Sequence, residues 1–322
     1  MRWLSVCIAL CAFAAESQIE ASVRGRERAA LTVESADAAG VRVLRDGSEI
    51  LLPWSAVREL TGDVSAELRG FEAGGEALWR GSSRLDRGDP IAALEPLEQA
   101  FDRFKTHDGV TTGEAADALL AARLRLGDAQ GGVVPWLVRM EQDDQLPTAP
   151  TARRVEIDPV LRLVPELPPI FIGSRVAPRV ASELAQDGFG RWSAGPNRKL
   201  AEIYATALLL AAGERPPPLP EETDLPGVRL AWAMVEARQP DQMARASARR
   251  VLRTELASAQ EPWIRAWCHA GIGLSLLLES QRERLAGVGH LLVVPSIYGE
   301  TQPNLAGICL AESARVLYEA GR

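Results

Sequence analysis

The spacing of apolar residues changes once along this chain of 322 residues, near Gly62. Before that point, apolar residues alternate with polar or small ones, which is typical of β-strands. After it, they recur three or four residues apart, which is typical of amphipathic helices. The pattern therefore predicts a mainly α-helical protein with a small β module, residues 16–62, at its amino end.

Within the β module, three pairs of apolar residues have strand spacing. They are Leu31 and Val33, Val41 and Val43, and Ile50 and Leu52. Asp46-Gly47 lies between the second and third pairs, and this dipeptide favours the positive φ angles of a two-residue hairpin turn. The segment is short for five closed strands, so we expect an incomplete barrel or a sheet of three or four strands.

Glycine, aspartate and proline divide the rest of the chain into segments of helix-hairpin length. The clearest unit runs from Ala77 to Phe104. Gly88 can end its first helix in the left-handed conformation, Asp89 can cap the second, and Pro90 suits the first turn of that helix. We therefore expect two antiparallel helices here.

A proline-rich stretch interrupts the helical pattern between Pro147 and Gly173. Its residues 167–172, Leu-Pro-Pro-Ile-Phe-Ile, are apolar and held extended by proline, so they can bridge two helical blocks or line a groove. We therefore divide the helical part into a block of residues 70–146, an irregular connector of residues 147–196 and a second block of residues 197–322.

Two helices of the second block stand out. Trp263 to Leu278 is apolar on almost every side and should lie deepest. The last helix should run from Pro303 to Ala320, with an apolar side formed by Leu305, Ile308, Cys309 and Leu317. Repeat arrays need a polar terminal helix to cover their last apolar face, and none follows, so we expect this end to pack against a neighbouring chain or partner.

Four residues of the first unit have the spacing of the small and large positions of a tetratricopeptide repeat (TPR): Gly81, Ala93, Leu97 and Ala100. The unit resembles a degenerate TPR, and the β module resembles the SH3-like or Sm-like barrels of some exported bacterial proteins. The resemblance implies an α-α hairpin solenoid of the cell envelope that recognises peptides or proteins.

The first fifteen residues have the pattern of a signal peptide. Arg2 precedes an apolar run from Trp3 to Ala15 that is too short to span a bilayer, and Ala12-Phe13-Ala14 suits a signal peptidase. A buried N-terminal helix and a lipoprotein signal at Cys11 are the alternatives, and the second is disfavoured because lipid modification usually requires a residue smaller than Leu10 before the cysteine. We expect a periplasmic or secreted protein with no integral membrane segment after signal removal.

Removal of that signal would leave two cysteines, Cys268 and Cys309, on different predicted helices. An exported protein meets an oxidising environment, so the two can form a disulfide if their helices pack closely. Two buried thiols that act as small hydrophobes are the alternative.

The formal net charge of −7 argues against a general nucleic-acid binder, because such binding depends on a basic surface. Acidic pairs such as Asp143-Asp144 lie in polar segments typical of solvated surface. The three histidines, His107, His269 and His290, fall in different predicted elements, so we predict no metal site, no cofactor and no catalytic residue.

Partner binding is the remaining function class, and aromatic or apolar residues are its usual anchors. Our candidates are Trp192, Phe189, Phe171, Ile170 and Trp136, led by Trp192 in a glycine-rich segment. We therefore expect a non-catalytic scaffold or adaptor for protein or peptide partners. The alternatives are a cell-envelope hydrolase acting on peptidoglycan or peptides, and a structural protein that self-associates through its C-terminal helix.

Overall fold

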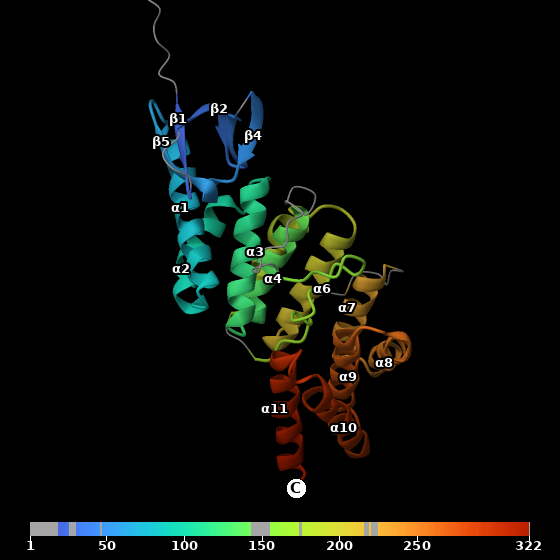
Figure 1. The fold of residues 1–322 in the computed structure, drawn as a ribbon. Coiled ribbons are helices and arrows are strands. Elements are labelled where there is room, and N and C mark those ends of the chain that lie inside the picture. Colours follow the sequence, from blue (N-terminus) through green and yellow to red (C-terminus); the bar gives the residue numbers. More distant parts are fainter. Residues whose placement is uncertain are drawn as a thin grey trace, which may run out of the picture.

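The computed structural model of the protein describes residues 19–25, 30–45, 47–142, 155–173, 176–215, 219 and 225–321. This part of the chain contains eleven α-helices and one five-stranded antiparallel sheet, which lies at the amino end (Figure 1). The prediction of a mainly helical protein with a small β module is confirmed. The predicted signal peptide and Asp46 lie outside the described residues.

The sheet has five strands, not the three or four that we expected. They are β1 (Glu20–Val23), β2 (Leu31–Asp37), β3 (Gly40–Arg45), β4 (Ser48–Leu52) and β5 (Val57–Thr61). Their order is β4-β3-β2-β1-β5, so the last strand returns to pair with the first. The strand count expected for a sheet was too low because the apolar pairs that we used lie in β2, β3 and β4, whereas β1 and β5 contain none of them.

The hairpin predicted in this sheet is confirmed. β3 and β4 pair in antiparallel register, with Arg45 opposite Ser48. Gly47 in the turn has a φ of 79°, in the left-handed region that glycine adopts without steric cost.

The sheet packs on the first helices through Trp54, in a 3₁₀ turn of residues Trp54–Ala56. The Trp54 indole is fully buried and donates from Nε1 to the carbonyl of Asp37 at 2.7 Å. Its backbone runs so close to Gly75 that a Cβ there would lie 2.4 Å from the Trp54 carbonyl oxygen. A side chain at position 75 would therefore separate the sheet from the helices.

The first helical block contains α1 (Ala66–Asp86), α2 (Pro90–Phe104), α3 (Val110–Arg125) and α4 (Ala129–Glu141). Asp89 accepts from the amide of Ala92 at the start of α2, as predicted. A Cβ on Gly81 would lie 2.5 Å from Cγ of Leu97 and 3.2 Å from the carbonyl oxygen of Ala93. The small residues that suggested a TPR-like unit thus lie where α1 and α2 approach closely.

Seven further helices follow: α5 (Ala177–Leu184), α6 (Pro196–Ala211), α7 (Pro226–Glu236), α8 (Gln242–Ser258), α9 (Pro262–Leu276), α10 (Gln281–Tyr298) and α11 (Pro303–Glu319). Of these, α5 lies within the segment that we expected to be irregular. As predicted, α9 is buried along most of its length. No helix in the described part of the chain is long and apolar enough to cross a membrane.

The start of α11 returns to the first helical block. Asn304 lies beside Gly127, where a Cβ would be 3.3 Å from the Asn304 side-chain oxygen. Leu305 is buried, whereas Leu310 and Tyr318 further along the helix are exposed. The apolar side that we predicted for this helix is therefore covered by the same chain, since Cys309 is fully buried and Ile308 and Leu317 pack against the core.

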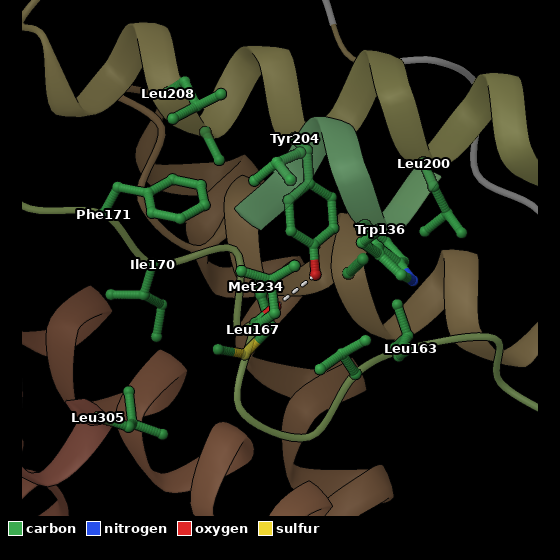
Figure 2. Close-up of a cluster of buried hydrophobic side chains, with 14 of the residues drawn as sticks. Trp136, Leu163, Leu167, Ile170, Phe171, Leu200, Tyr204, Leu208, Met234 and Leu305 are labelled. Carbon is green, nitrogen blue, oxygen red and sulfur yellow. Dashed lines mark hydrogen bonds between the residues drawn. The ribbon is translucent and has the colours of Figure 1, made fainter. Parts of the chain in front are cut away.

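Residues 155–173 form no helix or strand, yet they run through the interior (Figure 2). Tyr204 donates its hydroxyl to the carbonyl of Leu167 at 2.6 Å, and Trp267 donates from Nε1 to the carbonyl of Pro165 at 3.0 Å. These bonds satisfy backbone groups that would otherwise be unpaired in an apolar core. The segment thus joins α6 and α9 into one core.

Candidate functional site

The predicted partner-binding residues lie mostly inside the protein. Trp136, Ile170, Phe171 and Trp192 are at most 2% exposed, and Phe189 is partly buried. Trp192 also donates from Nε1 to the carbonyl of Leu184 at 3.0 Å. The expectation that Trp192 is an exposed anchor is wrong, because its large apolar ring packs in the core.

Both cysteines of the described chain are free and buried. Burial raises the pKa of each thiol, Cys268 and Cys309, to about 12. They are therefore protonated at neutral pH and lack the thiolate that nucleophilic attack requires. The structure supports the alternative of two small buried hydrophobes over a disulfide.

Two histidines that we placed in separate elements meet in the structure. His269 on α9 and His290 on α10 have their Nδ1 atoms 3.2 Å apart. Burial lowers the pKa of both imidazoles, and the charges of Arg265 near His269 and Arg253 near His290 lower it further. No third metal-ligating side chain joins them among the described residues.

A cavity of about 390 Å³, which we call the acidic pocket, lies where α3, the interior segment and α11 meet. It is lined by Ala121, Leu124, Arg125, Val155, Glu156, Glu166, Gln302, Pro303, Asn304 and Leu305. The volume lies within the range of about 300 to 1,000 Å³ that is usual for ligand sites. Its walls combine aliphatic side chains with a few polar groups, which is typical of such sites.

Two oxygen atoms on residues that line the acidic pocket have no hydrogen-bond partner among the described residues. They are Oε2 of Glu166 and Oε1 of Gln302, and both are shielded from solvent. Gln302 is only 3% exposed. A buried polar atom without a partner is destabilising, so both oxygens favour a ligand that brings N–H or O–H donors.

The charges of the acidic pocket also favour a donor. The lining contains two carboxylates, Glu156 and Glu166, and one guanidinium, Arg125, which donates to the carbonyl of Leu85 at 3.0 Å. Burial raises the pKa of Glu166, and the negative charge of Glu156 raises it further. A cation bound beside Glu166 would offset both the burial of its carboxylate and the repulsion from Glu156.

Sequence reasoning missed Glu166 and Gln302. The available signal was Glu166 itself, a charged residue between two prolines in an apolar run. Gln302 lies beside it only because α11 returns to the first block. No protein-family model, curated protein or solved structure matches the chain.

Proposed function

We propose that the protein is an exported, non-catalytic binding protein that holds a peptide or protein partner through its helical body, at the acidic pocket. The observation that carries the proposal is the pair of unpartnered oxygens, on Glu166 and Gln302, beside a cavity with aliphatic walls. A peptide supplies what this pocket lacks, since it offers N–H donors next to apolar side chains.

The excess of negative charge favours a peptide amino terminus over an internal amide. An ammonium group has three donors and no acceptor. It would interact favourably with the carboxylates of Glu156 and Glu166, whereas a neutral amide would gain only a hydrogen bond. Hydrogen bonds to charged groups stabilise by about 1.5 to 3 kcal/mol, against about 1 for neutral ones.

A hydrolase that uses a cysteine nucleophile is disfavoured on physical grounds. Cys268 is fully buried and its pKa is raised to about 12, so its thiol is neither accessible nor ionised at neutral pH. The acidic pocket has two carboxylates, but the Glu166 carboxylate is desolvated and no side chain among the described residues hydrogen-bonds its Oε2 to position it as a base. Binding therefore accounts for these groups better than catalysis.

Equilibrium dialysis tests the proposal directly. The full chain is dialysed against a mixture of random hexapeptides with free amino termini and amidated carboxyl ends, and retention is measured by mass spectrometry. We expect peptides with a free amine to be retained about tenfold more than N-acetylated ones, since a charged hydrogen bond adds about 1.4 kcal/mol or more. This preference for free amines should be smaller in the Glu166→Gln variant.

The matched control is Glu95→Gln, which removes an exposed carboxylate on α2 that does not line the pocket. It should retain the preference for free amines. If the unmodified protein retains neither peptide set, or if Glu166→Gln keeps the full preference, the proposed function is wrong.

A further inference from the structure

A second cavity, of about 240 Å³, lies on another part of α11, and we call it the arginine pocket. Its lining includes Arg238, Leu274, Leu277, Leu278, Glu312 and Arg315, and the rest of the lining is apolar or glycine. None of these residues lines the acidic pocket. The two cavities are therefore separate sites with different chemistry.

Arg238 is the polar group that distinguishes this cavity. Its Nη2 donates to the carbonyl of Phe171 at 3.1 Å, but its Nη1 is shielded from solvent and has no hydrogen-bond partner in the described part of the chain. Burial lowers the pKa of Arg238, and the negative charge of Glu312 opposes that shift. A guanidinium nevertheless stays protonated in proteins, so this is a buried charge with an unused donor.

The other charges leave the cavity positive. Glu312 accepts from Arg315, with 2.7 Å between its Oε2 and Nη2 of the arginine. Arg315 also pairs with Glu319 at 2.8 Å, and Glu319 pairs with Arg284 at 2.6 Å. These four paired charges cancel, so Arg238 leaves the site positive by one. A ligand with one negative charge would balance it.

The remaining walls are aliphatic or aromatic. Leu274 and Leu277 are 9% exposed, whereas Ile172 and Leu278 at the edge are 41% and 52% exposed. The volume is below the usual range for drug-sized ligands, which limits the occupant to a small molecule. We propose that the arginine pocket binds a small aliphatic monocarboxylate, with its carboxylate on Arg238 and its chain against Leu274, Leu277 and Leu278.

This proposal does not depend on peptide binding at the acidic pocket, and calorimetry can test it separately. The probe is 4-methylpentanoate, with 4-methylpentanamide as its neutral analogue and acetate as its short one. We expect the full-length protein to bind 4-methylpentanoate at least about tenfold more tightly than either analogue, since a charged hydrogen bond and aliphatic burial each add to affinity.

Two variants locate the site. Arg238→Gln should abolish the preference for the carboxylate over the amide, whereas Arg282→Gln, an exposed arginine on α10, should leave it unchanged. If Arg238→Gln does not fold by circular dichroism, Leu278→Glu replaces it, because Leu278 is half exposed and a carboxylate there would repel the probe. It should weaken the binding of the acid more than that of the amide, because both lose an apolar contact but only the acid is repelled.

Three results would overturn the proposal. One is equal binding of acid and amide, and another is a preference that survives in both the Arg238→Gln and Leu278→Glu variants. The third is displacement of the probe by an N-acetylated tripeptide ending in leucine at a lower concentration than the probe itself, which would assign the pocket to peptide carboxyl termini.

Discussion

At the scale of single residues, the tryptophans show that aromatic rings of one kind serve different roles. Trp192 is 1% exposed and hydrogen-bonded to a backbone carbonyl, whereas Trp79 on α1 is 41% exposed and lies under the guanidinium of Arg24 at 4.4 Å. A buried ring stabilises the folded protein through the apolar area that it buries and through its packing. An exposed cation–π pair stabilises it by only about 0.5 to 1 kcal/mol.

We therefore predict that Trp192→Ala lowers the free energy of unfolding by about 3 to 5 kcal/mol, because it leaves a large cavity in the core. Trp79→Ala should lower the free energy of unfolding by about 1 kcal/mol or less. Urea denaturation followed by circular dichroism measures both values. Equal costs for the two variants would show that the core around Trp192 contributes no more than the surface.

Residue burial is where the sequence was least informative. Glycine neighbours made Trp192 look like a surface anchor, but whether a ring is covered depends on helices distant in sequence. Two further partner-binding candidates are buried for the same reason, since residues 170 and 171 belong to a segment that crosses the core. The small residues at positions 81 and 93 were predictable, because a local helix pair determines their packing.

At the scale of elements, Glu279 joins the end of α9 to α8. Its Oε1 accepts from Nε of Arg245 at 3.0 Å and from Nη1 of Arg249 at 2.8 Å, and its side chain is 4% exposed. Arg249 also donates to the hydroxyl of Ser275 at 2.8 Å. One carboxylate therefore pairs with two buried arginines.

Removing that carboxylate should leave two uncompensated buried charges. We predict that Glu279→Gln lowers the free energy of unfolding by about 3 to 5 kcal/mol. Glu300→Gln, which changes an exposed carboxylate at the end of α10, should have little effect. Chemical denaturation at neutral pH compares the two, and a cost below about 1 kcal/mol for Glu279→Gln would contradict the assigned role.

The same contact makes stability depend on pH. The hydrogen bond from Arg245 is the main reason that the pKa of Glu279 lies below its ordinary value of 4.5. A carboxyl group with a lowered pKa in the folded state stabilises the protein above its unfolded pKa and loses that contribution on acidification. Stability should therefore fall below about pH 4.5, and this acid-sensitive part should be smaller in Glu279→Gln.

At the scale of the whole molecule, sequence periodicity predicted the helical content, the position of the β module and the hairpin within it. It did not predict that α11 returns to the first helical block, because such a contact depends on the path of the chain through eleven helices. Both pockets lie along α11, so neither could be predicted from local pattern.

The central claim is that the acidic pocket is where a partner binds. Hydrogen exchange measured by mass spectrometry, with and without the free-amine hexapeptide mixture, tests it most directly. We predict that bound peptide slows exchange in residues 155–167 and at the start of α11, and that Glu166→Gln removes this protection. Protection confined to other helices, or none at peptide concentrations that saturate binding, would contradict the claim.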